Sequence, residues 1–488
     1  MVIRNEIRRG FYLDSVALMR AARTIAMLPG VEEAGLMIGT PANKEVLRAA
    51  LLLNDIGAQA GPGDLILALR ANDASAAQSA MREAQRLLDR PRQVGGAAQW
   101  LPRTLRGAIK QMPDANLALI SVPGPFAAAE ARKALRRGLN AMIFSNNVPL
   151  GQEVALKREA RDLGRIIMGP DCGTAIIAGV PLAFANCIPR GDVGIIGASG
   201  TGMQEVCCLI GNGGRGISHA IGTGGRDLSA EVGGISTLMA IDLFDQDAAT
   251  KHVVLISKPP AEEVASIVLA RLKESPKPCT VCFIGAEPPQ RPIANVRFAD
   301  TLAHAAEIVL GRSLPNGSPA ASPRGGRLIR GLFCGGTLCA EAQAILRRFS
   351  FAVASNVPIS GAAPLGGNGH QHVLIDLGDE EFTRGMPHPM IEPAAREASL
   401  KDALVDKTVG IVLLDVILGW GSHPDPAGEL ARALAGRSAE GPLIVASVTG
   451  TERDPQVRSV QVRKLVDVGV TVAASNAAAA AMACRSVG

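Results

Sequence analysis

The sequence predicts an α/β protein of several domains, and three observations carry this prediction. The chain has 488 residues, enough for several hydrophobic cores. Hydrophobic residues make up 47% of it and charged residues 19%, a balance typical of globular proteins. Continuous apolar runs, each followed by a turn and a helical pattern, recur along the chain. Such strand–turn–helix units indicate parallel sheets that are covered on both faces.

The first 95 residues alternate between short strand patterns and amphipathic helix patterns. Strands are expected at 2–7, 32–39 and 64–71, and helices at 15–28, through KEVLRAALLL and at 75–89. This βαβαβα order predicts a small α+β domain of the ferredoxin-like or ACT-like kind over residues 1–95. The following stretch, 90–103, is expected to be a linker.

Two further α/β domains are expected in the middle of the chain, at 104–190 and 191–312. In the first of these, the loops VPGPF, FSNNVPL and GPDCG each follow a predicted strand. Ligands of open α/β sheets bind beyond the carboxyl ends of the strands. We therefore expect Asn146 and Asn147, in the second loop, to lie near a binding site. A Pro/Gly/Ser-rich linker at 312–327 ends this part of the chain.

A last domain is expected at 328–488, and its start repeats an earlier pattern. The stretch GDVGIIGASGTGMQEV is a buried strand, a Gly/Ser/Thr turn and a helix, and RLIRGLFCGGTLCAEAQAIL has the same order. Each helix start presents unpaired N–H groups that suit a phosphate, and the repetition predicts that both starts meet at one site. An ordinary capped helix start is the alternative. The candidate phosphate-binding residues are Ser199, Gly200, Thr201, Gly335, Gly336 and Thr337.

Charged and imidazole side chains supply the catalytic candidates. Arg226, in GTGGRDLS, is a candidate counter-charge for phosphate or carboxylate, and a surface ion pair with Asp227 is the alternative. His388 and His423 lie in polar clusters of the last domain and are candidates to polarise a carbonyl or to act as a base. His370 and His372 belong to no tight ligand set, so no metal site is expected.

Composition argues against several classes of protein. One Tyr and two Trp are few for stacking on nucleic-acid bases, and the net charge of +5 is spread along the chain without a basic block. No apolar run reaches the ~18 residues of a membrane span, and the first residues lack the apolar core of a signal peptide. Nine cysteines at irregular spacings do not form a disulfide framework. A cytoplasmic protein that binds anionic small molecules is expected, without nucleic-acid or membrane partners.

Several motifs resemble those of known proteins. Residues ~115–285 resemble the α subunit of succinyl-CoA synthetase in VPGPFAAAEARKAL, FSNNVPLGQE, GPDCGTAI, GDVGIIGASGTGMQEV and IGTGGRDLS. Residues ~328–488 resemble the carboxyl-terminal domain of that enzyme's β subunit. The fused order resembles the FdrA family, as do TPANKEVL, DLGDEEFTRGMPHPMI, LDVILGWGSHPDPA and GTERDPQ. The resemblance implies a Rossmann-like, CoA-binding-like domain at 104–190 and a flavodoxin-like domain at 191–312.

Three departures from succinyl-CoA synthetase bear on the chemistry. That enzyme phosphorylates a histidine in a GHAGA-type loop, and the corresponding region here has no such loop. His252 precedes a strand, and His304 is expected in the middle of a helix. The ATP-grasp domain and the GxTGxxG loop for CoA are also missing. CoA therefore stays only a candidate cofactor, and no other cofactor is expected.

The FdrA resemblance implies one subunit of an oxamate carbamoyltransferase, which interconverts oxalurate plus phosphate with oxamate plus carbamoyl phosphate. The implied ligands are phosphate, carbamoyl phosphate and a small carboxylate-amide such as oxamate. Other subunits of the transferase and self-association are expected. An acyl-CoA synthetase or CoA-binding enzyme is the first alternative, and a non-catalytic metabolite-binding subunit is the second.

Overall fold

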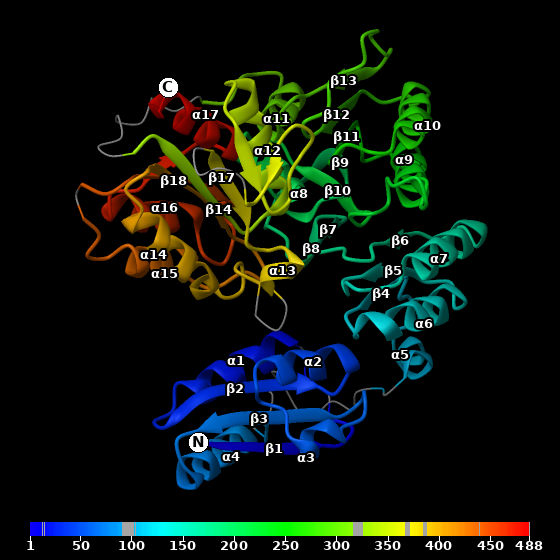
Figure 1. Ribbon diagram of the computed structural model, residues 1–488. Coiled ribbons are helices and arrows are strands. Elements are labelled where there is room, and N and C mark those ends of the chain that lie inside the picture. The colour runs from blue at the N-terminus through cyan, green and yellow to red at the C-terminus, as the bar shows by residue number, and fades with distance from the viewer. Residues whose placement is uncertain are drawn as a thin grey trace. The chain divides into compact units, whose positions relative to one another are not determined.

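The structure is a computed structural model that divides into two compact units. It describes residues 1–11, 13, 15–89, 102, 104–315, 326–366, 371–383, 388–438 and 440–487. One unit comprises Met1–Leu101 with Glu380–Pro387, and the other comprises Pro102–Asp379 with His388–Gly488. Most of both expected linkers, and His370, lie outside the described residues. Figure 1 shows helices against the sheets in each unit, which confirms the predicted α/β class.

The first unit is built on a three-stranded antiparallel sheet. Its strand order is β1 (Val2–Arg8), β3 (Leu65–Ala71) and β2 (Val31–Ile38). The central strand is buried on both faces: Leu65, Leu67 and Leu69 pack with α1 (Ser15–Ala26) and α4 (Ala74–Asp89). Ile66 and Ala68 instead join the cluster that holds Leu47 of α2 (Pro41–Ala49). Because successive side chains of a strand alternate, one apolar run serves two cores. The short α3 (Asp55–Ala58) completes this unit.

The second unit begins with a small parallel sheet. Its order is β4 (Leu117–Ile120), β5 (Asn140–Ile143) and β6 (Ile167–Met168). Its helices are α5 (Leu105–Gln111), α6 (Gly124–Leu135) and α7 (Leu150–Asp162). The loops that follow β4 and β5 touch, since a Cβ at Gly124 would lie 2.3 Å from the Asn146 carbonyl oxygen. The carboxyl edge of this sheet is therefore closely packed.

A seven-stranded sheet follows, in the order β13-β12-β11-β9-β10-β7-β8. Its strands are β7 (Thr174–Ile177), β8 (Val180–Ala183), β9 (Arg190–Gly197), β10 (Ile217–Gly222), β11 (His252–Ser257), β12 (Cys279–Phe283) and β13 (Val296–Phe298). Its helices are α8 (Gly200–Asn212), α9 (Ile235–Gln246), α10 (Glu262–Lys273) and α11 (Leu302–Leu310). The β7–β8 hairpin lies in the range 104–190 but pairs antiparallel with β10, so it extends the sheet of the next segment.

The last sheet is parallel throughout, in the order β16-β15-β17-β14-β18-β19-β20. Its strands are β14 (Leu328–Phe333), β15 (Val353–Ser355), β16 (Ala363–Pro364), β17 (His372–Asp376), β18 (Val409–Ile417), β19 (Leu443–Thr449) and β20 (Thr471–Ala473). Its helices are α12 (Gly336–Arg348), η1 (Pro393–Arg396), α14 (Glu397–Val405), α15 (Pro426–Ala433), α16 (Arg458–Asp467) and α17 (Asn476–Val487), whereas α13 (Glu380–Thr383) belongs to the first unit. The apolar run around Asp415 forms the fully buried strand β18.

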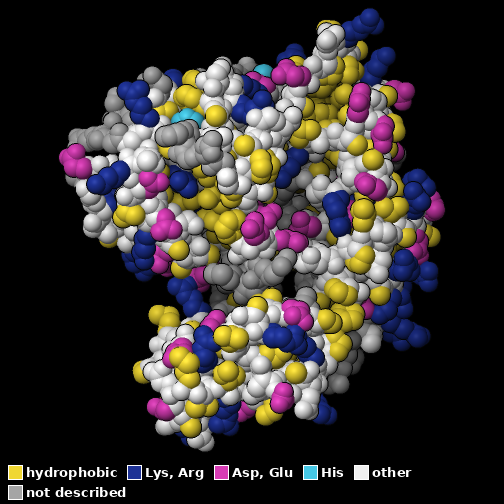
Figure 2. Space-filling view, viewed as in Figure 1, with side chains coloured by type: hydrophobic (Ala, Val, Ile, Leu, Met, Phe, Trp, Pro, Cys, Tyr) yellow, Lys and Arg dark blue, Asp and Glu magenta, His cyan; other side chains and the backbone are white. Residues whose placement is uncertain are grey.

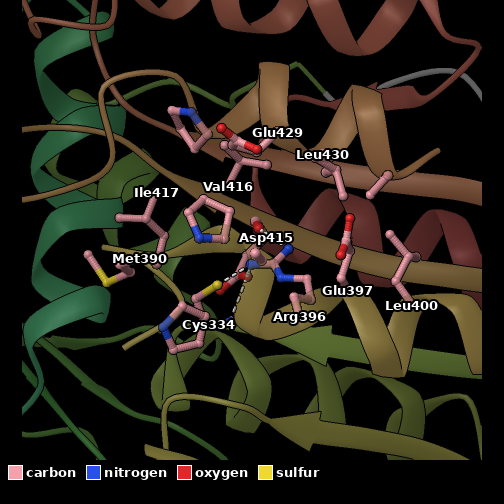
Figure 3. A pocket seen from close by; sticks show the side chains of 15 residues that line it. Cys334, Met390, Arg396, Glu397, Leu400, Asp415, Val416, Ile417, Glu429 and Leu430 are labelled. Carbon is pink, nitrogen blue, oxygen red and sulfur yellow. Dashed lines mark hydrogen bonds and ion pairs between the residues drawn. The ribbon is translucent and has the colours of Figure 1, made fainter. Parts of the chain in front are cut away.

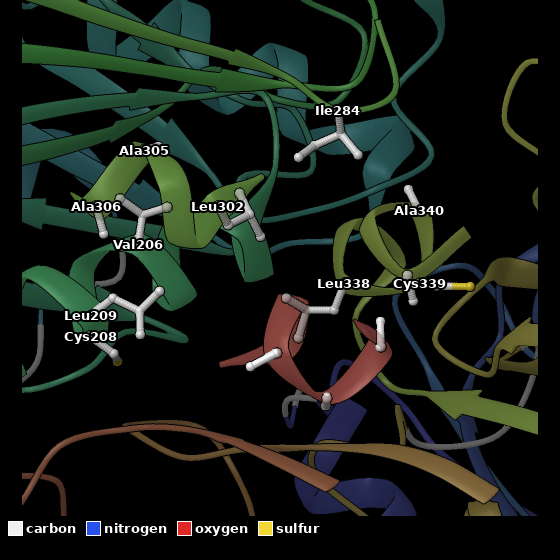
Figure 4. Close-up of a cluster of buried hydrophobic side chains, with 14 of the residues drawn as sticks. Val206, Cys208, Leu209, Ile284, Leu302, Ala305, Ala306, Leu338, Cys339 and Ala340 are labelled. Carbon is white, nitrogen blue, oxygen red and sulfur yellow. The ribbon is translucent and has the colours of Figure 1, made fainter. Parts of the chain in front are cut away.

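One hydrophobic core joins the two large sheets. Figure 4 shows Val206 and Leu209 of α8, Leu302 of α11 and Leu338 of α12 among its side chains. The core also takes Met482 from α17. Burial of this apolar surface holds α8 and α12 against each other. The positions of their N-termini are therefore fixed by packing as well as by local sequence.

The surface carries charges of both signs. Figure 2 shows Lys and Arg side chains interspersed with Asp and Glu over the visible face of the described residues. This agrees with a net charge of +5 that is spread along the chain. No helix among the described residues is long and apolar enough to span a bilayer.

Candidate functional site

The start of α8 follows directly from a buried strand. β9 ends at Gly197, and Ser199 has extended backbone angles and caps the helix. Its hydroxyl oxygen accepts a hydrogen bond from the Gly202 N–H at 3.2 Å. A serine cap satisfies one N–H group of the first turn and leaves others free for a ligand.

The N-termini of α8 and α12 meet, as the repeated pattern predicted. Ser199 and Thr337 hydrogen-bond to each other through their hydroxyl groups. A Cβ at Gly202 would lie 2.8 Å from Thr337 Cγ2, and one at Gly335 would lie 2.8 Å from Thr201 Oγ1. Both glycines are therefore required for the two helix starts to approach this closely.

A cleft opens at the start of α8. Its described lining comes from the loop after β6, from the end of β9 with the start of α8, and from the loop after β10. The lining residues are Asp171, Cys172, Gly173, Thr174, Gly197, Ala198, Ser199, Gly200, Gly222, Gly224 and Gly225. None of these residues belongs to α12. The two helix starts are thus in contact, but only the N-terminus of α8 lines the cleft.

The glycine loop after β10 is shaped to leave this cleft open. Gly224 has a φ of +87°, and a Cβ there would lie 2.3 Å from the Pro170 carbonyl oxygen. A Cβ at Gly225 would instead meet no heavy atom within 4 Å. Gly224 is therefore required by its surroundings, whereas Gly225 keeps space free for a ligand.

A buried ionic network anchors this glycine loop from behind. Lys157, on α7, is fully buried and its Nζ donates to the Thr223 carbonyl oxygen at 2.9 Å and to Asp227 Oδ1 at 2.7 Å. Its Nζ also lies 3.0 Å from Glu153 Oε1. Asp227 accepts further hydrogen bonds from Thr237. Buried charges with this many partners fix the loop relative to α7 and α9.

Arg226 is turned away from the cleft. Its guanidinium donates to the Val148 carbonyl oxygen at 2.7 Å and lies 2.8 Å from Glu153 Oε2. The surface ion pair with Asp227, the alternative raised by the sequence, does not form, because Asp227 is buried against Lys157. Arg226 is half-exposed and would have to leave these partners to reach a ligand in the cleft.

Asn146 and Asn147 are exposed and do not line the cleft. Their loop lies beside it, because the Asp171 N–H donates to the Ser145 carbonyl oxygen at 3.0 Å. Both asparagines therefore lie next to the residues that line the cleft. No ligand contact is assigned to their side chains.

The start of α12 is held by a carboxylate from β18. Asp415 is fully buried and accepts hydrogen bonds from the Cys334 and Gly335 N–H groups, each at 2.8 Å. Arg396 lies 3.1 Å from the same carboxylate. Burial raises the pKa of Asp415, and the Arg396 charge and these N–H groups oppose that rise.

Asp376 is the second carboxyl group at the start of α12. It ends β17, and a Cβ at Gly336 would lie 2.5 Å from its Oδ2 atom. Burial raises the pKa of Asp376 to about 7, and the nearby Lys258 opposes the rise. A carboxyl group with this pKa exchanges a proton near neutral pH, which suits a general acid or base.

His388 lies beside these groups. A Cβ at Gly378 would be 2.5 Å from His388 Nε2 and 2.6 Å from the Cys334 carbonyl oxygen. Burial lowers the pKa of His388 to about 4, so its ring is neutral at pH 7. Its Nδ1 accepts the Met390 N–H at 3.2 Å, which leaves the proton on Nε2. His388 is therefore arranged as a hydrogen-bond donor and not as a base.

His423 has a different place. Its Nδ1 accepts the Asp425 N–H at 3.1 Å, and its Nε2 lies 3.8 Å from a Glu429 carboxylate oxygen. These partners belong to the start of α15. His388 thus adjoins the start of α12 and His423 adjoins α15, and their loops are in contact, because the His423 N–H donates to the Met390 carbonyl oxygen at 2.8 Å.

The histidines near the region of a phosphohistidine loop do not line the cleft. His252 begins β11, is buried, and has a pKa lowered to about 4 by burial. Its Nε2 lies 2.8 Å from Thr280 Oγ1. His304 lies in the first turn of α11 and pairs with Asp300 at 2.7 Å, rather than in mid-helix as expected.

Sequence reasoning missed the buried charges around the site. Asp376, Asp415 and Lys157 were not singled out. Asp415 left one signal, a lone carboxylate inside an apolar run, and Asp376 left another, a carboxylate at the end of a predicted strand. Lys157 left none, because its amphipathic helix gives no hint that one lysine is fully buried.

The described residues hold no group of three or more candidate metal ligands. Cys279 and Cys282 lie in β12, and burial raises the pKa of both thiols. Such thiols are unreactive, which agrees with a structural place for the pair.

A full-length relative decides the family. The chain is 38% identical to the uncharacterized protein YahF of Escherichia coli (strain K12), over 98% of this chain and 97% of that protein. This full-length match and the matches to three family models together establish the family. The chain belongs to the FdrA family of succinyl-CoA-synthetase-like proteins.

Three family models match this FdrA-type chain. Residues 1–100 match the AllF heavy metal-associated domain, residues 190–286 match a CoA binding domain, and residues 332–485 match the CoA-ligase family. The sequence led us to expect a CoA-binding-like domain at 104–190. The CoA binding model instead matches the following segment, 190–286. Residues 1–100 contain neither Cys nor His, so they match the first model without the usual ligands of soft metals.

Other relatives share part of the FdrA-type chain. It is 25% identical to the succinate–CoA ligase [ADP-forming] subunit alpha 1 of Archaeoglobus fulgidus, over 36% of this chain and 60% of that subunit. A solved structure of acetyl-coenzyme A synthetase 1 from Ca. Korarchaeum cryptofilum, with phosphate and ADP, is 15% identical. It covers 76% of this chain and 82% of that one, with a TM-score of 0.30.

CoA is compatible with the FdrA-type site. CoA carries phosphate groups, and the α8 cleft has the glycine lining and helix N-terminus that suit a phosphate. The open space at Gly225 leaves room for such a group. Ser199 and Gly200 are the residues that would hold it.

Proposed function

We propose that this FdrA-type chain is a carbamoyltransferase subunit that holds phosphate, or the phosphate end of carbamoyl phosphate, at the N-terminus of α8. The observation that carries the proposal is the α8 cleft, whose described lining includes Ser199, Gly200 and the open Gly225 but no histidine. A helix N-terminus stabilises an anion, and without a histidine the phosphate is bound but not transferred to the protein.

The proposed reaction interconverts oxalurate plus phosphate with oxamate plus carbamoyl phosphate. A phosphate oxygen attacks the carbamoyl carbon, the bond from that carbon to the oxamate nitrogen breaks, and the nitrogen takes a proton. Asp376 is the proposed proton donor, because it lies against Gly336 at the start of α12, which contacts the start of α8, and has a pKa of about 7. His388 Nε2–H is the proposed donor to the carbonyl oxygen as negative charge develops there. Other subunits and self-association would complete the enzyme.

A second candidate function is an acid–thiol ligase or CoA-binding enzyme. The CoA-ligase and CoA binding domain matches favour it, and they do so more directly than they favour carbamoyl transfer. The difference lies in the cleft, because a ligase of the succinyl-CoA synthetase type requires a phosphorylated histidine. A third candidate is a non-catalytic, metabolite-binding subunit, and turnover by the purified chain alone would exclude it.

Thermal unfolding of the full chain with phosphate, carbamoyl phosphate, oxamate, CoA or ATP distinguishes these functions. A ligand at 100 times its Kd adds about 2.7 kcal/mol to the stability of the folded state. We expect stabilisation by phosphate and carbamoyl phosphate at concentrations at which CoA and ATP give none. Stabilisation by CoA without phosphate would overturn carbamoyl transfer in favour of the ligase.

Comparison of the variants Gly225→Ala and Gly151→Ala tests where phosphate binds. Both glycines have open space at the Cβ position and neither has a positive φ, but only Gly225 lines the cleft. Gly225→Ala is expected to abolish stabilisation by phosphate, and Gly151→Ala to leave it unchanged. Equal phosphate stabilisation in both variants would show that the ligand binds elsewhere.

A further inference from the structure

A second pocket lies in the last domain, beneath η1, α14 and α15 and against the end of β18 (Figure 3). We infer that this pocket binds a small, uncharged molecule with an amide or urea group on an aliphatic body. It shares no lining residue with the α8 cleft, so the inference is independent of the proposed function. Three features of the pocket define this ligand: its walls, one unpaired donor and two acceptors.

The walls of the pocket are mostly apolar. Met390, Leu400, Ile417 and Leu430 line it together with several proline and alanine residues. Figure 3 shows these side chains on several sides of Arg396 and Asp415. Binding sites for small molecules typically combine such apolar walls with a few placed polar groups. Such walls suit a ligand with an aliphatic body.

Arg396 supplies an unpaired hydrogen-bond donor. Its side chain is 8% exposed. Nη1 donates to the Asp415 carbonyl oxygen at 2.8 Å, and Nη2 donates to Asp415 Oδ1 at 3.1 Å and to Cys334 Sγ. The remaining donor, Nε, is buried without a partner. An unsatisfied buried donor costs ~1–3 kcal/mol, so an acceptor oxygen from a ligand stabilises the site.

The charge balance of the pocket favours an uncharged ligand. Asp415 already compensates the Arg396 charge. Two further carboxylates, Glu397 and Glu429, belong to the lining. They lie 3.6 Å from Lys401 and beside Arg432, respectively. Each of these charges therefore has a counter-charge, and a ligand carboxylate would be buried without one.

An amide or urea group satisfies all of these requirements together. Its carbonyl oxygen accepts from Arg396 Nε–H, and its N–H donates to the carboxylate of Glu397 or Glu429. A carboxylate has no donor for the glutamates, and an ammonium group has no acceptor for Arg396. The pocket is therefore complementary to an amide and to neither charged analogue.

Isobutyramide, isobutyrate and isobutylamine are matched probes, because they share an aliphatic body and differ in the polar group. Calorimetric titration of the full chain is expected to show saturable binding of isobutyramide. The two charged probes are expected to bind at least tenfold more weakly. Equal affinity for isobutyramide and isobutyrate, or no binding of isobutyramide, would overturn the inference.

The variants Ala433→Phe and Ala435→Phe locate the binding. Ala433 is a half-buried lining residue, whereas Ala435 is exposed two residues later and does not line the pocket. Isobutyramide binding should be lost in the first variant and kept in the second. If the first variant fails to fold, a crystal of the unsubstituted chain soaked in isobutyramide decides. An amide at Arg396 supports the inference, and an ordered water alone at Nε, or an amide elsewhere, overturns it.

Discussion

The hydroxyl groups of Ser199 and Thr337 hydrogen-bond to each other across 138 positions of sequence. Only Ser199 lines the α8 cleft, so the two hydroxyls are expected to contribute unequally to phosphate binding. Ser199→Ala should weaken phosphate binding about tenfold or more, because a hydrogen bond to a charged group contributes ~1.5–3 kcal/mol. Thr337→Ala should change phosphate binding by less than about threefold, because Thr337 does not line the cleft. Each tenfold in Kd corresponds to about 1.4 kcal/mol.

Calorimetric titration with inorganic phosphate measures both variants. Phosphate affinity that is unchanged in the double variant Ser199→Ala/Thr337→Ala would contradict binding at these helix starts. Equal losses in the two single variants would instead show that phosphate reaches both helices.

The ionic network behind the glycine loop is expected to dominate local stability. Lys157→Met should lower the free energy of unfolding by ~3–5 kcal/mol, because Asp227 would stay buried without its cation and Glu153 would keep only Arg226. Lys133→Met is the matched control: Lys133 is exposed and pairs with Glu130 on α6. That surface pair is worth ~0–1 kcal/mol. Urea unfolding measures both, and similar losses would contradict a special role of the buried network.

Glu341 is expected to make stability depend on pH. It is buried on α12, accepts from the Leu302 N–H and from Asn476 Nδ2, and its pKa is raised to about 7 by burial. A carboxyl group whose folded pKa is raised binds a proton on folding. Its contribution is complete below the unfolded pKa near 4.5 and is lost as pH rises towards 7.

Glu341→Gln should remove this loss. Relative to the variant, the unsubstituted chain should lose up to about 1.4 kcal/mol of stability per pH unit between pH 4.5 and 7. The comparison is needed because His252 and His388, with pKa values lowered to about 4, oppose the trend between about pH 4 and 6.5. Urea unfolding from pH 4.5 to 8 gives the difference, and parallel curves for the two chains would contradict the prediction.

Asp376 is expected to set the pH dependence of the proposed transfer. With a pKa of about 7, its protonated form falls away as pH rises through neutrality. The rate of oxalurate phosphorolysis by the assembled enzyme should therefore fall as pH rises through neutrality. Asp376→Asn should abolish this descending limb of the pH–rate profile and lower the rate by ~100-fold or more. Glu341→Gln removes a second group of similar pKa whose carboxylate is bonded to Leu302 N–H and Asn476 Nδ2 and has no proposed part in the transfer, so it should keep the limb. A limb that persists in Asp376→Asn would assign the proton to another group.

Much of the fold could be predicted because its signals are local. The strands at 2–7 and 64–71 and the helix at 75–89 appear within a residue or two of their expected bounds. Apolar periodicity and glycine turns encode such elements over a few residues. Pairing was less accessible: the β7–β8 hairpin joins the sheet of the following segment, and only packing with β10 decides this.

The candidate site was predicted in part. The helix starts at Ser199 and Gly335 were found because caps and glycine turns have a local pattern. The orientation of Arg226 was not, because its partners Val148 and Glu153 come from a distant loop and helix.

The sequence by itself determined the α/β class, the two matching strand–turn–helix units and the absence of Cys and His from residues 1–100. These follow from residue type and short spacing. Only the tertiary structure decided that Ser199 meets Thr337, that α12 does not line the cleft, and that Asp376 and Glu341 have pKa values near 7. Those properties arise from desolvation and long-range packing, which depend on residues far apart in the chain.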